Sequence, residues 1–451
     1  MKCFILILVV LPVLSCSFDN KTGIWKDASD ISVNNQGSKS IENNENERRY
    51  EDVFVKNKIF NEEKNSPSNF IFKLDGQEIT DNWLEQYGDK TNNISNFSYG
   101  GYKTLLSKSS KLGKLSSNKN VIFYDEKLIT TDHKGKIFIY SLSLKKKIFE
   151  YNFYKKNFKK FNKKIYLVVS GDVLYAADNL GYMYAIDLNN KSLLWAKNYG
   201  IPFRSNLKII DKQIILADQD NLIYSINLKT GAKNWQFATT QTFLKSDFEN
   251  NFVISKLQDS LFFLNTSGEL YSINYSSQKI NWIINFRGAS LPGDTKLFLS
   301  QPVVVKNNSL IISTENAILH YNTMTSFKNW SFPSNAILKP ILTSNYTYLL
   351  SANNLLICIE NKTGKVLWSK NVYKNISEKI IKKIGKLYDF KIANDELKIF
   401  SRNGYLLSFN YRSGNTEYIK EISKKGISSE VFFVKDTMYL LDNNNRLLKF
   451  N

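Results

Sequence analysis

The chain has 451 residues, 43% of them hydrophobic, and a formal net charge of +20 at pH 7. Seven of the 61 basic residues are Arg, which leaves 54 Lys spread along the sequence. Nucleic-acid recognition usually relies on the bidentate fork of Arg, so this composition argues against a nucleic-acid-binding protein. We interpret the charge as a solvated, lysine-rich surface. Weak attraction to anionic lipid headgroups or lipopolysaccharide is the alternative.

Residues 1–15 have the features of an export signal. One Lys precedes an apolar stretch that is too short to span a bilayer, and the stretch ends in Val13-Leu-Ser-Cys16. This ending resembles a bacterial lipobox, which predicts that Cys16 becomes the first residue of the mature chain and carries acyl chains such as palmitate. An ordinary signal peptide with an incidental Cys is the alternative. Ser17 after the Cys favours export onward to the outer membrane.

Residues 16–80 are rich in Asn, Lys, Glu and Ser without a sustained period, which predicts a polar tether. Of the three Cys, Cys3 leaves with the signal and Cys16 is the predicted anchor. Cys358 lies in an apolar run and is expected to be a buried free thiol. No disulfide is therefore expected in the domain that follows, residues 81–451.

A unit that recurs seven times dominates this domain. In each copy a Gly or Asn precedes an aromatic residue by 14 positions. The pairs are Gly135 and Phe149, Gly181 and Trp195, Asn221 and Trp235, Gly268 and Trp282, Asn316 and Trp330, Asn354 and Trp368, and Gly404 and Tyr418. Successive aromatic residues are 38 to 50 positions apart, a spacing typical of one propeller blade.

Each unit has the pattern of a meander of short antiparallel strands. Gly or Asn tolerates a positive φ at the opening turn, and an alternating strand, a polar turn and a second strand follow. An apolar run upstream supplies further strands. We expect the repeated aromatic residues to pack between blades, where each buries a large apolar area.

An eighth copy begins with Met438–Leu441 and Asn445–Phe450, and the sequence ends before its last strand. Without that strand the blade would have an open edge. The segment Trp83-Leu-Glu-Gln-Tyr-Gly88 carries a Trp outside the series, and we expect it to supply the missing strand. The sequence thus predicts an all-β, eight-bladed propeller of four-stranded antiparallel blades, with the last blade closed by an N-terminal strand.

No motif for catalysis or metal binding is evident. The two His, His133 and His320, lie in different repeats, and there is no HExxH, CxxC, GxSxG or Walker loop. Asp132, Asp218 and Asp220 fall at blade turns, where Asp accepts hydrogen bonds from backbone N–H groups. We predict no catalytic, cofactor-binding or metal-binding residues and no enzymatic activity.

The repeat resembles that of quinoprotein dehydrogenases, most clearly in Ile226-Asn-Leu-Lys-Thr-Gly231 through Trp235. Those enzymes also carry adjacent cysteines and a calcium-binding set of acids and amides. This chain has no adjacent cysteines and is shorter. A quinone-dependent oxidoreductase is therefore retained as an alternative without any residue carried over to a quinone site.

The combination of lipobox, polar tether, Trp-x-x-Gln-x-Gly segment and eight blades resembles the BamB family, the propeller lipoproteins of the outer-membrane β-barrel assembly machinery. The resemblance implies a non-catalytic scaffold, anchored by lipid at the periplasmic face of the outer membrane. Such a scaffold binds a POTRA domain of the barrel insertase within a hetero-complex and supports the insertion of outer-membrane β-barrel proteins. A lipid-anchored propeller that binds another envelope partner, such as a polysaccharide or another protein, is a further alternative.

In that family, the partner surface uses inter-blade loops with apolar residues beside an Arg. Two loops here match loosely, Ile201-Pro-Phe-Arg204 and Asn285-Phe-Arg-Gly-Ala-Ser290. The resemblance implies a partner-binding set of Ile201, Phe203, Arg204, Phe286 and Arg287, because exposed aromatic and Arg side chains suit an interface. The alternative is that both Phe are core residues and both Arg stabilise their loops.

Overall fold

The computed structural model describes residues 62–101, 104–114, 118–154, 158–241, 251–287 and 298–451, and the strands β1 (Ser17–Phe18) and β2 (Trp25–Lys26). The chain divides into two compact units, Met1–Val55 and Lys56–Asn451. In the first unit, β1 pairs with β2 in antiparallel fashion. Cys16 lies outside the described residues, so its lipidation stays a prediction.

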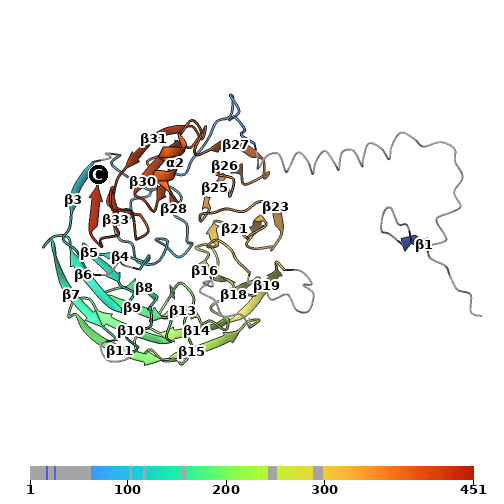
Figure 1. Ribbon diagram of the computed structural model, residues 1–451. Helices are drawn as coiled ribbons and strands as arrows, with labels where there is room; N and C mark the ends of the chain where they lie inside the picture. The colour runs from blue at the N-terminus through green and yellow to red at the C-terminus, as the bar shows by residue number, and fades with distance from the viewer. Residues whose placement is uncertain are drawn as a thin grey trace, which may run out of the picture. The chain divides into compact units, whose positions relative to one another are not determined.

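The second unit is a ring of eight four-stranded sheets, which confirms the predicted all-β, eight-bladed propeller (Figure 1). Blades 1 to 4 comprise β4 (Ile122–Tyr124), β5 (Lys127–Thr131), β6 (Lys136–Ser141), β7 (Lys146–Asn152); β8 (Ile165–Ser170), β9 (Val173–Asp178), β10 (Tyr182–Asp187), β11 (Ser192–Asn198); β12 (Lys208–Ile210), β13 (Gln213–Ala217), β14 (Leu222–Asn227), β15 (Lys233–Ala238); and β16 (Asn251–Ile254), β17 (Ser260–Leu264), β18 (Glu269–Asn274), β19 (Lys279–Asn285). Blades 5 to 7 comprise β20 (Val304–Lys306), β21 (Ser309–Ser313), β22 (Ile318–Asn322), β23 (Lys328–Phe332); β24 (Ile341–Leu342), β25 (Tyr346–Leu350), β26 (Leu355–Glu360), β27 (Val366–Asn371); and β28 (Leu387–Ala393), β29 (Glu396–Ser401), β30 (Tyr405–Asn410), β31 (Thr416–Glu421).

Within each of these blades the strands follow one another from the ring axis to the rim. The first strands of neighbouring blades lie side by side around the axis. The middle strands are almost fully buried, as in β9 and β17, whereas a rim strand such as β11 is largely exposed. This gradient explains why apolar runs mark the inner strands and polar residues mark the rim.

The 14-residue spacing of the repeat corresponds to one fixed register. Every repeated aromatic residue lies on the fourth strand and pairs with the residue ten positions before it, as Trp195 pairs with Ala185 and Trp368 with Cys358. A register shift follows this pair in all seven blades. Six of the seven turn residues have a positive φ, and Asn316 is the exception.

The repeated Trp residues lie between blades, as predicted. The indole N–H of Trp195 donates to the carbonyl of Leu228, at 3.0 Å, and that of Trp330 donates to the carbonyl of Asn361, at 2.9 Å. In both cases the acceptor lies after the third strand of the next blade. Cys358 is buried and free, also as predicted.

An N-terminal strand closes the eighth blade, but it is not the Trp83 segment. Blade 8 consists of β32 (Phe432–Val434), β33 (Thr437–Leu441), β34 (Leu447–Phe450) and β3 (Leu105–Lys108), and β3 pairs with β34. Trp83 instead forms an isolated bridge with Phe123 in the first strand of blade 1. The prediction chose the wrong segment because it relied on the Trp, whereas β3 carries none and all four of its residues are exposed.

Residues 80–100, here called the axial segment, run around the inside of the ring. The backbone of Trp83 exchanges two hydrogen bonds with Phe123 of blade 1, and the carbonyl of Leu84 accepts one from Val169 of blade 2. The carbonyls of Lys90 and Thr91 accept from the first strands of blades 4 and 5. The segment therefore continues the inner edge of the sheets, where unpaired backbone groups would otherwise face an open channel.

The axial segment contacts the other four blades, 3, 6, 7 and 8, through side chains and further backbone groups. Lys208 of blade 3 places its Nζ 2.9 Å from Oε2 of Glu85. Asn93 exchanges two hydrogen bonds with Leu342 of blade 6, and Phe97 exchanges two with blade 7. At the two ends of the segment, Thr80 and Gly100 each bond to blade 8. The axial segment thus contacts all eight blades.

Residues 62–77 form an arm along blades 6 and 7. Lys64 and Ser369 exchange backbone hydrogen bonds of 2.9 and 3.0 Å, which extends the rim edge of β27. Phe72 packs against Tyr346 and Tyr411. These residues were expected to belong to the tether, and they belong instead to the propeller unit, which begins at Lys56.

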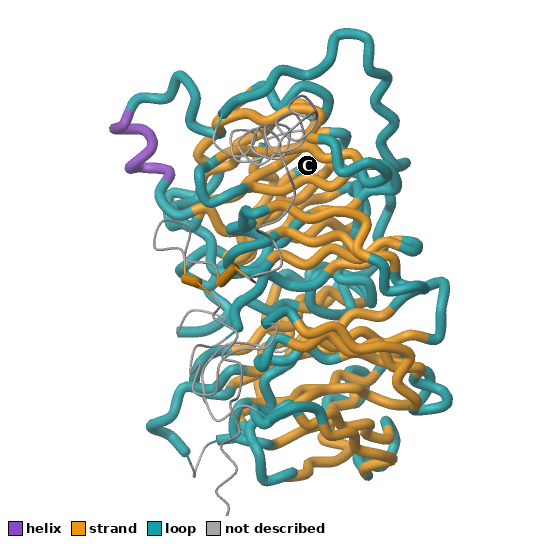
Figure 2. The backbone as a smooth tube through the Cα atoms, turned by 90° about the vertical axis from the view of Figure 1, so that its right-hand side faces the viewer, coloured by secondary structure: helices purple, strands orange, loops and turns teal. Residues whose placement is uncertain are grey.

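One short helix, α2 (Glu378–Ile384), interrupts the connection between blades 6 and 7 and projects beside the strands in Figure 2 (purple). It has a single buried residue, Ile384. In the described part of the chain, no helix combines the length and the apolar character needed to cross a membrane.

Candidate functional site

One face of the ring carries the residues predicted to bind a partner. Because each blade has four antiparallel strands, the inter-blade connections and the turns between second and third strands emerge at the same end. We call this the connection face. The other face carries the remaining turns, and there the axial segment enters and leaves the ring, near Lys435 and Asp436.

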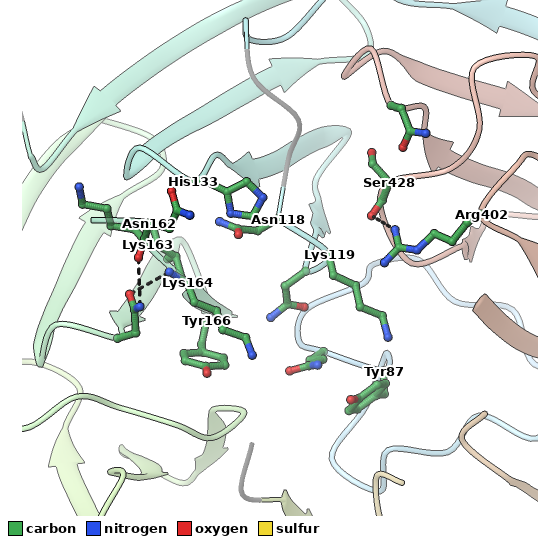
Figure 3. A pocket seen from close by; sticks show the side chains of 15 residues that line it. Tyr87, Asn118, Lys119, His133, Asn162, Lys163, Lys164, Tyr166, Arg402 and Ser428 are labelled. Atoms are coloured by element: carbon green, nitrogen blue, oxygen red, sulfur yellow. Dashed lines mark hydrogen bonds between the residues drawn. The ribbon is translucent and has the colours of Figure 1, made fainter. Parts of the chain in front are cut away.

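A cavity of about 670 Å³ opens near the axis on the connection face (Figure 3). Its walls come from blades 1, 2, 7 and 8, and the axial segment contributes to its floor. The lining residues are Gln86, Tyr87, Asn118, Lys119, Asn120, His133, Asn162, Lys163, Lys164, Ile165, Tyr166, Asn179, Arg402, Ser428 and Asn443.

The lining of this axial cavity is basic and rich in amides. Lys119, Lys163, Lys164 and Arg402 contribute four positive charges, and no Asp or Glu is among the lining residues. Figure 3 shows Lys164 and His133 on one side of the opening and Arg402 on the other. An arrangement of this kind attracts anions, because charges at a concave surface reinforce one another.

Fixed contacts hold the Arg402 side chain in place. Its Nη1 donates to the carbonyls of Ile427 and Ser428, both at 3.2 Å, and its guanidinium lies 3.4 Å from the ring centre of Tyr388. Such contacts orient the guanidinium before any ligand arrives, which lowers the entropy lost on binding.

Lys163 is the most buried cation of the cavity. Its side chain is 1% exposed, its ammonium donates to the carbonyl of Phe158, and it lies over the ring of Tyr154. Burial and the nearby charge of Lys134 lower the pKa of Lys163. Asp178 and Asp132, which lie outside the cavity lining, oppose this lowering of the pKa.

Two amide side chains in the cavity are buried without a hydrogen bond to their oxygens. Gln86 is 9% exposed and Asn120 is 7% exposed. No described group donates to Oε1 of Gln86 or Oδ1 of Asn120. By contrast, Asn118 and Asn179 are engaged with neighbouring loops, since Asn118 donates to Thr131 and Asn179 accepts from Lys164.

The first predicted partner loop contains one core residue and two half-buried residues. Phe203 is fully buried and packs edge-on against Tyr199 and Tyr224, so it is a core residue and cannot reach a partner directly. Ile201 and Arg204 are half-buried. The backbone N–H of Arg204 donates to Ala217 of blade 3, which ties the loop to the turn beside it.

The second predicted partner loop lies between blades 4 and 5. Phe286 is half-buried, stacks with Phe298 and contacts Tyr321 edge-on. Arg287 is also half-buried, and its backbone N–H donates to Oδ1 of Asn285. Residues 288–290 lie outside the described part of the chain. The two loops are thus on the same face but are separated by blades 3 and 4.

Two of the three acidic turn residues, Asp132 and Asp218, accept backbone hydrogen bonds as predicted. Oδ1 of Asp132 accepts hydrogen bonds from the N–H groups of Lys134 and Lys136, and Oδ1 of Asp218 accepts from those of Asp220 and Leu222. No group of His, Cys, Asp or Glu among the described residues is arranged to hold a metal ion.

Comparisons with known proteins agree with this architecture. The family described as outer membrane protein assembly factor BamB matches residues 146–370, from β7 to β27. The outer membrane protein assembly factor BamB of Moranella endobia (strain PCIT) is 20% identical over 303 residues, which are 61% of this chain and 71% of that protein. The crystal structure of BamB from Moraxella catarrhalis superposes with a TM-score of 0.60 at 12% identity and covers 77% of this chain and 99% of that one.

The chain is a BamB-like protein. The likeness extends to enzymes that share the fold. Quinohemoprotein alcohol dehydrogenase from Comamonas testosteroni superposes with a TM-score of 0.60 at 8% identity, over 82% of this chain and 80% of the enzyme. At that identity the likeness concerns the fold alone. The BamB-like assignment rests on the family match and on the related sequence.

Proposed function

We propose that this BamB-like chain is a non-catalytic scaffold that supports the assembly and insertion of outer-membrane β-barrel proteins. The observation that carries the proposal is the family match over residues 146–370, from the last strand of blade 1 to the last strand of blade 6, since the matching family is described as an outer membrane protein assembly factor. The related sequence from Moranella endobia carries the same description.

The filled ring axis supports this proposal over a quinone-dependent oxidoreductase. A planar cofactor between the inner strands would have to displace the axial segment, which is hydrogen-bonded to every blade through backbone groups and through side chains such as Asn93 and Lys208. The cavity that stays open beside the segment has no Asp or Glu in its lining to hold the calcium ion that those enzymes use. Trp83 and Phe97 of this segment are buried against Phe432 and Phe433. Displacing the segment would expose these aromatic faces, at a cost that grows with the apolar area exposed.

In this proposal the partner surface lies on the connection face and includes Ile201, Arg204, Phe286 and Arg287. Phe203 would act indirectly, by holding its loop against Tyr199 and Tyr224. The partner is a POTRA domain of the barrel insertase, with other subunits of the assembly machinery in the same complex. Lipidation of Cys16 would anchor the chain at the periplasmic face of the outer membrane.

Co-purification of the lipid-anchored chain from solubilised membranes tests the proposal. Insertase subunits should be recovered in stoichiometric amounts, identified by mass spectrometry. The rival activity is measured on the same preparation, with added quinone cofactor and calcium and with dye reduction on alcohols or sugars as the readout. Recovery without insertase subunits, or turnover of these substrates, would overturn the scaffold assignment.

Charge reversal separates the predicted surface from the rest of the ring. We expect Arg287→Glu to weaken binding to the isolated POTRA domains by about tenfold or more, because one charged partner of a desolvated contact is replaced by a like charge. Arg412→Glu is the matched control, since Arg412 is exposed in the turn before β31, on the opposite face. If both variants bound the POTRA domains with equal affinity, Arg287 would not be part of the interface.

The same substitution at Arg204 has a second expected effect. Its Nε and Nη1 are buried, so Arg204→Glu should lower the melting temperature as well as the affinity. An Arg204→Glu variant that binds normally would show that this loop is not part of the interface.

A further inference from the structure

We propose that the axial cavity of the connection face binds an anionic saccharide, a sugar that carries a phosphate or a carboxylate. None of the five predicted partner residues is among the lining residues of this cavity. This site does not depend on the scaffold assignment.

The charges of the cavity define the anionic part of the ligand. Lys119, Lys164 and Arg402 line it from blades 1, 2 and 7, so one bound anion could contact cations from several directions. Lys119 lies over the ring of Tyr388, and the carboxylate of Glu430, outside this lining, partly compensates its charge. Charge-assisted hydrogen bonds from Lys and Arg to phosphate or carboxylate oxygens are among the stronger polar contacts in proteins.

The unpaired amides define the polyhydroxylated part. Gln86 and Asn120 are more than nine-tenths buried, and their amide oxygens accept no hydrogen bond from a described group. A buried acceptor without a donor destabilises the fold, so its presence in a cavity indicates that a donor comes from elsewhere. Inorganic phosphate carries at most two O–H donors, both on one phosphorus atom, whereas a sugar carries several hydroxyls around its ring that both donate and accept.

The cavity has little apolar surface, which argues against a lipid chain as its ligand. Ile165 is the only aliphatic side chain among the fifteen lining residues, so an acyl chain would find little apolar surface to contact. A volume of about 670 Å³ lies in the range of small-molecule sites. The half-buried ring of Tyr87 supplies a flat surface against which a sugar ring can lie.

Isothermal titration of the full chain, purified in detergent, tests the proposal. The probes are glucose 1-phosphate, glucuronic acid, glucose, inorganic phosphate and tri-aspartate. We expect one or both sugar anions to bind at least about tenfold more tightly than glucose or phosphate, because only they engage both the cations and the amides. Phosphate as tight as the sugar anions, tighter binding of tri-aspartate, or binding of no probe would each overturn it.

Two variants locate the binding. Lys119→Gln/Lys164→Gln should weaken sugar-anion binding by at least about tenfold. Lys229→Gln/Lys362→Gln removes the same charge from exposed turns on the opposite face and should leave the affinity unchanged. An equal loss in both double variants would show that the attraction is general to the lysine-rich surface, and would overturn the site.

Asn120→Leu tests the saccharide part alone. The substitution removes a buried amide whose oxygen has no donor, so the melting temperature should stay the same or rise. Binding of the sugar anion should weaken severalfold while binding of inorganic phosphate is unchanged. A variant that loses stability and retains the full affinity would show that Asn120 serves the fold and not a ligand.

Discussion

The rim and the axis of this propeller are held together by different kinds of contact. At the rim, one unit repeats with a fixed register, and each blade meets the next through an aromatic residue such as Trp195 or Trp368. At the axis, a single non-repeated segment contacts all eight blades with backbone groups, amides and the buried pair of Glu85 and Lys208. A ring made of similar units can therefore depend on a unique segment to fill its centre.

The largest expected effect is at the rim, for Trp368→Ala. Trp368 is fully buried between blades 6 and 7, and its loss should lower the free energy of unfolding by about 3 to 5 kcal/mol, as measured by denaturant titration. Trp235→Ala should cost less, because Trp235 is only half-buried. Equal effects at the two positions would mean that burial of the repeated aromatic does not set its contribution.

Asn92→Ala tests the axis. Asn92 is fully buried, and its side chain donates to Phe252 and Val303 and accepts from Lys208. Leaving these groups unpaired should cost about 2 to 4 kcal/mol. Asn307→Ala is the control, since Asn307 has a similar φ, 51° against 55°, but is exposed.

The control removes the backbone contribution from the comparison. Placing Ala at a positive φ costs about 1 kcal/mol at both positions. If Asn92→Ala destabilised the protein no more than Asn307→Ala, the polar contacts of the axial segment would contribute nothing, and the ring would be held by the rim alone.

A smaller and pH-dependent effect concerns His320, which pairs with Trp330 in blade 5. His320 is 2% exposed, and burial lowers its pKa to about 4. The unfolded chain, with a His pKa of about 6.5, therefore binds more protons between these values. The free energy of unfolding should fall by about 3 kcal/mol as the pH drops from about 6.5 to about 4.

Two variants check the assignment of this pH dependence. In denaturant titrations from pH 7 to pH 4, the free energy of unfolding of His320→Gln should lack the fall of about 3 kcal/mol that we assign to His320. His133→Gln, at an exposed position, should leave the pH dependence of the free energy of unfolding unchanged. If His320→Gln kept the pH dependence of the wild-type protein, the loss of stability in acid would arise from other groups in the ring.

The sequence was sufficient for the rim and insufficient for the axis. The spacing of 14 residues between a turn residue and an aromatic residue recurs once in each of seven blades, so the number of blades and the position of the aromatic residues between blades could be predicted from it. The axial segment has no repeat, and its partners are up to about 350 residues away, as for Thr80 and Phe433. Its Trp83 suggested a role in closing the eighth blade, but β3 supplies that strand.

The axial cavity was missed for a related reason. Its residues come from four blades and the axial segment, and they share no motif or spacing that a single sequence displays. The only available signal was the lysine-rich composition, which could not distinguish a solvated surface from a concave site. For the partner loops, the pairing of Phe with Arg could not separate a core residue such as Phe203 from the half-buried Phe286.

Hydrogen–deuterium exchange across the axial segment tests most directly whether the ring axis is permanently filled, on which the non-catalytic account depends. Peptides covering residues 80–100 should exchange as slowly as the first strands β4, β20 and β28, because their amide groups would open only when the ring unfolds. Rapid exchange of this segment, with the blades still protected, would contradict the account, because the channel could then empty and admit a cofactor.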